Sequence, residues 1–277
     1  MPFKDKFIVL GNEEGKATLL YHANAYNPEM YGPFVRNFPD RKFIALKQRP
    51  LWDSNVKTIR DWSIFTEDLI SFCDEMGINA IDAIGHSLGA VAIWKASVKR
   101  PDLFKNIVLI DPVVLPQETV RWVNFLPFKL KARIRPIIKI ASLRKNWWAS
   151  KEEAASHLGS KSVFKRFTPE VFDLFIQYGI HKNDDGSASL AYPREWEAMI
   201  YASPENIWKF LSKTEKEIFL IRAEHSNVLS GESWLKLQKH NNQNEYFEMK
   251  GVGHLIPFEK PVELARIIAD YLAEKTY

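Results

Sequence analysis

The sequence predicts an α/β protein with a mostly parallel central sheet flanked by helices. Short apolar runs alternate along the chain with segments of helical periodicity. Each run is apolar at successive positions, as expected for strands that helices cover on both faces. A third observation is an interval at residues 116–203 that breaks this alternation, and it predicts an insertion.

The alternation gives the expected elements in order. We predict strands at residues 17–21, 43–46, 80–84, 107–110, 218–221 and 246–249. We predict helices at residues 61–76, 88–98, 234–240 and 261–274. The first helix has apolar residues at helical spacing and ends at Gly77, and Pro101 closes the second. Because the pattern resumes after the interval, both halves are expected to build one sheet.

The 277-residue chain is long enough for one large domain with an insertion. We predict a core formed by residues 1–115 and 204–277, and a helical cap or lid formed by residues 116–203. No apolar run approaches the ~18 residues that cross a bilayer, and the apolar stretch at residues 7–10 is too short for a signal-peptide core. A single cysteine, Cys73, excludes an internal disulfide, so a cytoplasmic location is expected.

One part of the predicted cap is strongly basic. Residues 121–145 contain eight Lys or Arg and no acid, and their apolar residues form a stripe at helical spacing: Leu126, Leu130, Ile134, Ile138 and Ala141. In one interpretation the stripe packs on the core and the charges face water. In the other, it is a basic amphipathic surface that contacts a membrane or an anionic substrate. Pro136 interrupts the stripe, which weakens both interpretations.

A candidate nucleophile lies in the pentapeptide Gly85-His86-Ser87-Leu88-Gly89. A predicted strand precedes it and a predicted helix follows it, which is the strand–turn–helix arrangement of a nucleophile elbow. The two glycines remove side chains that would collide in so tight a turn. Ser87 is therefore predicted to be an exposed, strained nucleophile at a helix N-terminus.

A serine hydroxyl needs a base, and His254 is the candidate. It follows the last predicted strand on a loop that Gly251 and Gly253 make permissive. That loop lies at the carboxyl edge of the sheet, where ligands bind in open α/β folds. His225, on a loop after another strand, is the one rival.

Acyl transfer also needs N–H donors for the oxyanion. The backbone N–H of Leu88, directly after the nucleophile, is one candidate. The loop at residues 21–26, which follows an early strand, is expected to supply the second.

The chain resembles the α/β-hydrolase fold superfamily, of the serine hydrolase or esterase type with a helical cap. The resemblance extends nearly from end to end and rests on four segments in order, at residues 22–25, 85–89, 107–112 and 251–254. It implies a cap after the sixth strand. It also implies Asn24 as the second oxyanion donor, although Ala23 replaces the usual glycine.

The triad acid departs from the family pattern. Most relatives have an Asp shortly after the seventh strand, where this chain has Ser226 and Asn227. The favoured candidate is Asp111, which ends the sixth strand, a position that carries the acid in some family members, including certain dehalogenases. Glu224 is the alternative acid. A site without a carboxylate, with Asn227 in its place, also stays open.

The expected function is a serine hydrolase that cleaves a carboxylic ester through an acyl-enzyme on Ser87, as a carboxylesterase or lipase-like enzyme does. The cap is rich in aromatic residues, which predicts a hydrophobic acyl substrate. The predicted pocket residues are Tyr26, Trp122, Trp147, Trp148 and Leu255. Similar epoxide hydrolases and haloalkane dehalogenases have Asp at the elbow, so Ser87 argues against their chemistry.

Two other functions stay open. One is carbon–carbon bond hydrolysis or a lyase reaction at the same site. The other is a catalytically decayed, ligand-binding protein, which the missing acid after the seventh strand favours. The histidines are scattered and no glycine-rich nucleotide loop follows a strand, so neither a metal nor a cofactor is expected. The net charge of +4 gives no argument for nucleic acid as a partner.

Overall fold

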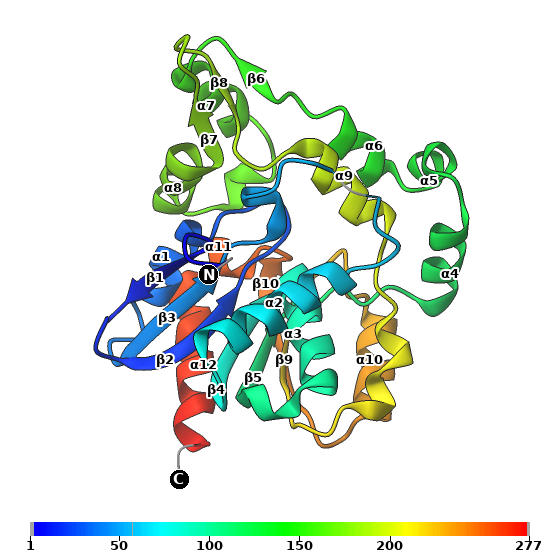
Figure 1. Ribbon diagram of the computed structural model, residues 1–277. Helices are drawn as coiled ribbons and strands as arrows, with labels where there is room; N and C mark the ends of the chain where they lie inside the picture. Colours follow the sequence, from blue (N-terminus) through cyan, green and yellow to red (C-terminus); the bar gives the residue numbers. More distant parts are fainter. Residues whose placement is uncertain (1–2, 57, 276–277) are drawn as a thin grey trace.

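A seven-stranded sheet forms the centre of the computed structural model, which describes residues 3–56 and 58–275 (Figure 1). In chain order its strands are β1 (Phe7–Gly11), β2 (Lys16–Tyr21), β3 (Arg41–Leu46), β4 (Ile81–His86), β5 (Phe104–Ile110), β9 (Phe219–His225) and β10 (Glu245–Gly253). Their spatial order is β1-β3-β2-β4-β5-β9-β10, and β1 alone is antiparallel to its neighbour. The predicted fold class is confirmed. Five residues of the predicted core lie outside the described part of the chain: Met1, Pro2, Lys57, Thr276 and Tyr277.

Helices cover both faces of this sheet. They are α1 (Gly32–Val35), α2 (Ser63–Met76), α3 (Leu88–Lys99), α10 (Gly231–His240), α11 (Ile256–Glu259) and α12 (Pro261–Glu274). Leu19 and Leu20 are adjacent in β2 and fully buried, yet they belong to separate hydrophobic clusters. The first cluster includes residues of α2 and α3, and the second includes residues of α1 and α12. Since successive side chains of a strand point to opposite faces, the sheet is buried on both sides.

All six predicted strands and the four helices predicted outside the interval are present. The sequence did not indicate β1, which was treated only as a short apolar stretch. This edge strand pairs with β3 alone, and its residues are half-buried or exposed, so it lacks the continuous apolar run of the inner strands. Within the described residues, no helix is both long and apolar enough to cross a membrane.

An insertion between β5 and β9 lies over one end of the sheet (Figure 1). β5 is the strand that the family resemblance counts as the sixth. The helices of the insertion are α4 (Gln117–Phe125), α5 (Phe128–Ile134), α6 (Pro136–Ser142), α7 (Lys151–Gly159), α8 (Pro169–Gly179) and α9 (Arg194–Ala202). It also contains a small antiparallel sheet of β6 (Trp147–Trp148), β7 (Ile180–Lys182) and β8 (Ala188–Leu190). Strands of two or three residues are too short to leave a periodic signal, and the sequence did not predict them. The exact cap limits, residues 116 and 203, stay a prediction.

The basic segment forms three short helices rather than one. Pro127 and Pro136 stand at the starts of α5 and α6, where a proline ring ends a preceding helix. Only Ile138 and Ala141 of the expected apolar stripe are buried. The interpretation in which the whole stripe packs on the core is therefore wrong for Leu130 and Ile134, which are exposed.

The start of α3 lies directly against the end of β2. A Cβ added to Gly89 would lie 2.1 Å from the backbone oxygen of Tyr21, and one added to Gly85 would lie 2.6 Å from Cα of Ala90. Both contacts are with backbone, which cannot rotate away. Gly89 therefore lets α3 approach the end of β2, and Gly85 lets α3 fold back closely on β4.

We predict that Gly89→Ala destabilises the fold by roughly 3 kcal/mol, the upper end of the usual cost of overpacking, because backbone must move to admit the methyl group. Gly231→Ala is the matched control, since a Cβ there meets no atom within 4 Å. The measurement is the free energy of unfolding from urea titration. Equal stability of the two variants would show that the contact with Tyr21 is not tight.

Candidate active site

Ser87 occupies the turn between β4 and α3 in a strained backbone conformation. Its φ is 58° and its ψ is −116°, a region that side-chain-bearing residues rarely adopt. Its N–H donates to the oxygen of Ile110, which ties the turn to β5 at 3.0 Å. Strain of this kind persists only where the surrounding structure holds it, and such positions cluster at functional sites.

The structure brings Ser87, His254 and Asp111 into one hydrogen-bonded chain. Nε2 of His254 lies 2.8 Å from Oγ of Ser87, and Nδ1 lies 2.7 Å from Oδ2 of Asp111. An ionised carboxylate only accepts, so Nδ1 carries the proton and donates it to Asp111. The lone pair on Nε2 then faces the Ser87 hydroxyl, which is the tautomer that a general base requires.

The Asp111 carboxylate is fully buried and held by several donors. Oδ1 accepts from the N–H of Ala223 at 2.9 Å, and Oδ2 accepts from the hydroxyl of Ser226 at 2.7 Å as well as from His254. Ser226 stands where the family pattern has its Asp, so the chain has a partner for the acid at that position. Asp111 also has a positive φ of 40°, which gives the site a second strained residue.

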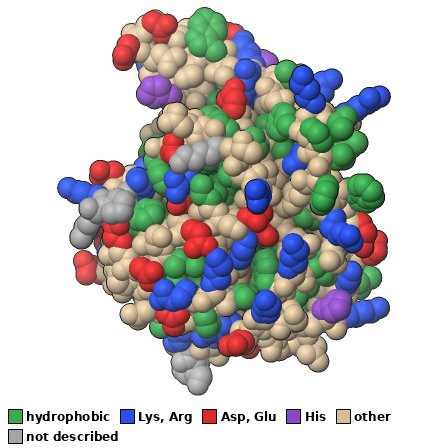
Figure 2. All heavy atoms as spheres, turned by 45° about the vertical axis from the view of Figure 1, so that its right-hand side comes forward, with side chains coloured by type: hydrophobic (Ala, Val, Ile, Leu, Met, Phe, Trp, Pro, Cys, Tyr) green, Lys and Arg blue, Asp and Glu red, His purple; other side chains and the backbone are tan. Residues whose placement is uncertain are grey.

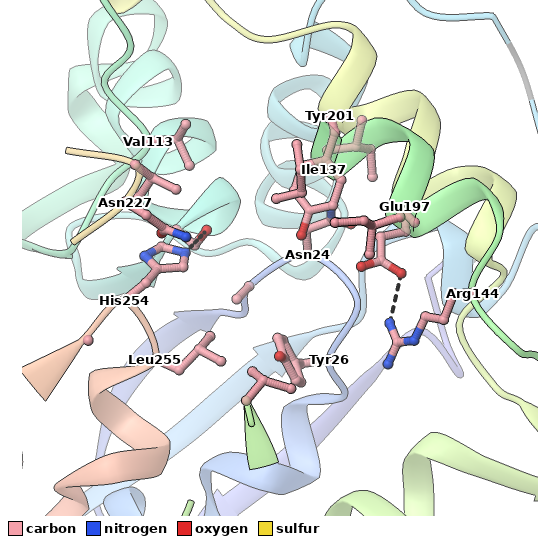
Figure 3. Close-up of a pocket in the computed structure, with 18 of the residues that line it drawn as sticks. Asn24, Tyr26, Val113, Ile137, Arg144, Glu197, Tyr201, Asn227, His254 and Leu255 are labelled. Atoms are coloured by element: carbon pink, nitrogen blue, oxygen red, sulfur yellow. Dashed lines mark hydrogen bonds and ion pairs between the residues drawn. The ribbon is translucent and has the colours of Figure 1, made fainter. Parts of the chain in front are cut away.

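The alternative acid is not placed to act. Glu224 accepts from the N–H of Gly251 at 2.8 Å and from Lys250, and these interactions lower the pKa of its carboxyl. Among the described residues it makes no hydrogen bond to His254, because its two carboxylate oxygens are bonded to Lys250 and Gly251. The rival base, His225, is exposed beside Glu224 and is not bonded to Ser87. Asn227 lines the cavity beside His254 (Figure 3). Nδ1 of that histidine, however, is bonded to Asp111.

The two predicted oxyanion donors, Asn24 and Leu88, both line the cavity that contains Ser87. Within the described part of the chain, neither backbone N–H donates to another protein atom. The Asn24 side chain is fixed through Oδ1, which accepts from the Tyr192 hydroxyl at 2.8 Å. Its buried Nδ2 has no hydrogen-bond partner there. Among the described residues, the backbone N–H groups of Asn24 and Leu88 therefore have no protein acceptor that would compete with a substrate oxyanion.

A buried polar network connects the loop of Asn24 to the loop of His254. The N–H of Ala23 donates to the Tyr31 hydroxyl at 2.9 Å, and this hydroxyl lies 2.7 Å from Nδ1 of His86. Nε2 of His86 lies 2.9 Å from the backbone oxygen of His254, to which it must donate. Burial lowers the pKa of His86 well below its usual value, so the ring stays neutral and can accept at Nδ1. Sequence reasoning missed Tyr31, because nothing local marks a tyrosine in a short helical turn as a partner of the elbow.

The site opens into a cavity of about 1270 Å³ between the sheet and the insertion. Of the predicted pocket residues, Tyr26 and Leu255 line it (Figure 3). The prediction is wrong for Trp122, Trp147 and Trp148. Trp122 and Trp147 are exposed on the outside of the insertion, whereas Trp148 is fully buried within it. Their aromatic character alone could not indicate the direction in which they point.

Trp62 lines the cavity instead, together with apolar residues of α6 such as Ile137. Figure 3 shows His254 on one side of the cavity and a salt bridge between Arg144 and Glu197 on the other, with the two charged groups 2.8 Å apart. Burial by itself would lower the pKa of the Arg144 guanidinium. The neighbouring Glu197 carboxylate has the larger, opposite effect, so the pKa is raised. The cavity wall therefore combines many apolar side chains with several charged ones, and the Arg144–Glu197 pair lies opposite the histidine.

A family model described as "Alpha/beta hydrolase family" matches residues 32–267, which is most of the chain. The chain belongs to the alpha/beta hydrolase family. The strand order, the elbow between β4 and α3 and the histidine after β10 agree with this membership.

Several known proteins resemble this alpha/beta hydrolase. Abhydrolase domain-containing protein ACTT2-1 of Alternaria alternata is 25% identical over 229 residues, which cover 69% of this chain and 82% of the relative. Ethanol acetyltransferase 1 of Cyberlindnera fabianii is 22% identical over 236 residues, which cover 78% of this chain and 67% of the relative. The crystal structure of E-2-(acetamidomethylene)succinate hydrolase has a TM-score of 0.77 at 17% identity, over 96% of this chain and 94% of that one. At this identity the structural likeness shows the fold alone.

We predict that Asp111→Asn lowers kcat about 10⁴-fold, because an amide at this position favours the wrong tautomer of His254. Glu224→Gln is the matched control and should stay within a few-fold of wild type. Steady-state kinetics, with circular dichroism to show that both variants fold, make the comparison. A large loss in Glu224→Gln, with Asp111→Asn nearly unaffected, would identify Glu224 as the acid.

Proposed function

We propose that this alpha/beta hydrolase is a serine hydrolase that cleaves carboxylic esters through an acyl-enzyme on Ser87. The observation that carries the proposal is the Ser87–His254–Asp111 hydrogen-bond chain at the wall of a large, mostly apolar cavity. The buried Asp111 supplies the acid that the sequence lacks after β9. It thereby favours an enzyme over the decayed, ligand-binding alternative.

The proposed reaction follows the geometry step by step. Oγ of Ser87 attacks the ester carbonyl carbon as its proton passes to Nε2 of His254, and Asp111 stabilises the imidazolium. The backbone N–H groups of Asn24 and Leu88 stabilise the oxyanion. When the tetrahedral intermediate collapses, His254 gives its proton to the departing alcohol and the acyl group stays on Ser87. Water, deprotonated by His254, then releases the carboxylic acid and restores the serine.

The cavity supports a hydrophobic acyl group. Ile137, Ile140 and Leu255 are among the side chains that line it, and apolar walls with a few polar groups are typical of small-molecule sites. A volume of about 1270 Å³ exceeds what a short acyl chain fills. We therefore propose a medium or long acyl chain.

A second candidate is transfer of the acyl group to an alcohol. The relative from Cyberlindnera fabianii is named an ethanol acetyltransferase, and the same acyl-enzyme serves both reactions. The two differ only in whether water or an alcohol attacks the acyl group on Ser87. Carbon–carbon bond cleavage would also use Ser87 and His254, but no described contact favours it over ester cleavage.

The test is a series of p-nitrophenyl esters with acyl chains from acetyl to decanoyl. We expect kcat/KM to rise with chain length as the acyl group fills the cavity, and Ser87→Ala to lower kcat roughly 10⁶-fold. Parallel reactions with ethanol, analysed for ethyl ester against free acid, separate transfer from hydrolysis. Folded wild-type protein that hydrolyses no ester in the series, or hydrolyses it equally well after Ser87→Ala, would overturn the proposal.

A further inference from the structure

Seven large apolar side chains lie exposed within a stretch of 22 residues on α4, α5 and α6 and the residue after α6: Trp122, Phe125, Phe128, Leu130, Ile134, Ile140 and Leu143. Phe125 is 92% exposed and Trp122 is 70% exposed. α5 has no buried residue at all. A contiguous exposed apolar surface marks a binding site more often than single exposed residues do.

Cations accompany these apolar side chains. Arg121, Lys129, Arg133 and Lys139 are exposed on the same three helices, and none of them pairs with an acid among the described residues. Residues 121–145 contain no Asp or Glu. In Figure 2, hydrophobic side chains gather with Lys and Arg on the side of the molecule where these helices lie in Figure 1. We call these seven apolar and four basic residues the α4–α6 patch.

The α4–α6 patch borders the mouth of the active-site cavity. Ile134, Ile140 and Leu143 are exposed and also line the cavity that contains Ser87. A flat surface that covered the patch would therefore lie next to the opening through which a substrate enters.

We propose that the α4–α6 patch docks this protein onto an anionic phospholipid bilayer. Aromatic and aliphatic side chains enter the boundary between headgroups and acyl chains, while lysines and arginines remain at the level of the phosphates. Charge complementarity selects this occupant: the three helices carry four exposed, unpaired cations against one exposed acid, Glu118. This excess of positive charge suits a surface of phosphates, whereas a second copy of the patch would place like charges together. Trp122, Phe125, Phe128 and Leu130 are exposed and do not line the active-site cavity.

The docking itself does not depend on the proposed chemistry. Its consequence for function does rest on the proposed function: the cavity would take ester substrates that partition into the bilayer, directly from its surface. The substrate class is then a hydrophobic ester dissolved in the membrane.

The first experiment measures binding of the Ser87→Ala variant to sedimented vesicles, so that catalysis plays no part. Vesicles of equal phosphatidylglycerol and phosphatidylcholine are compared with vesicles of phosphatidylcholine alone. We expect binding to the anionic vesicles that weakens as NaCl is raised, because salt screens the attraction. Removing three cations, in Lys129→Gln with Arg133→Gln and Lys139→Gln, should weaken binding about 10²-fold, at roughly fivefold for each charge.

The apolar half of the patch is tested with Phe125→Ala and Leu130→Ala together. The matched control is Leu235→Ala with Val262→Ala, two exposed apolar residues outside the patch. All four side chains are exposed, so both pairs should melt at the wild-type temperature. We expect the first pair to weaken vesicle binding at least tenfold and the control pair to leave it unchanged. The proposal is overturned if the parent protein does not bind anionic vesicles at low salt, if both pairs bind alike, or if the patch instead mediates dimerisation.

A second experiment separates the docking from the chemistry. Wild type and the Phe125→Ala, Leu130→Ala pair are assayed with soluble p-nitrophenyl acetate and with a p-nitrophenyl ester of a long acyl chain held in anionic vesicles. We expect equal rates on the soluble ester and a several-fold lower rate for the pair on the vesicle-held ester. Equal rates on both esters would contradict supply from the bilayer. Absence of any hydrolysis would overturn the proposed function and leave the binding result standing.

Discussion

The burial of the Asp111 carboxylate is the constraint on which the rest of the site depends. A buried carboxylate is costly unless hydrogen-bond donors surround it, and here Ala223, Ser226 and His254 supply them. Two of these donors come from β9 and the turn after it, and the third follows β10. The parallel order β4-β5-β9-β10 brings these strand ends to one edge of the sheet, so residues 143 and 167 positions apart in sequence become hydrogen-bonded partners of His254.

Buried histidine and tyrosine side chains that stay neutral hold the loops around the Ser87–His254–Asp111 hydrogen bonds. Burial lowers the pKa of His22 to about 4, and its Nε2 accepts from the N–H of Gln48 at 2.9 Å. Neutral His86 and Tyr31 likewise connect the loop of Asn24 to the loop of His254 through hydrogen bonds. Neutral buried partners fix geometry without adding charge near Ser87. Together with the strained backbone of Ser87 and Asp111, they describe a site held rigidly by the core, while the α4–α6 patch above it faces solvent.

Sequence reasoning succeeded where the signal is local and failed where it depends on tertiary direction. The Ser87 elbow is marked by Gly85 and Gly89, whose role their backbone contacts explain, and the His254 loop is marked by Gly251, whose φ is 70°. The choice between Asp111 and Glu224 needed the sheet order, because the two residues end neighbouring strands and sequence distance cannot rank them. The tryptophans of the insertion were misplaced for a related reason. A two-residue strand at Trp147 and Trp148 turns one ring outward and the other inward, and no periodic pattern of that length is readable.

The central claim is that Ser87 is a nucleophile activated by His254 and Asp111. The most direct measurement is labelling of the folded protein with a fluorophosphonate, followed by peptide mass spectrometry to locate the adduct. We predict one adduct per chain, on Ser87, formed much more slowly in His254→Ala. A folded protein that stays unlabelled, or that is labelled at a residue other than Ser87, would contradict the account.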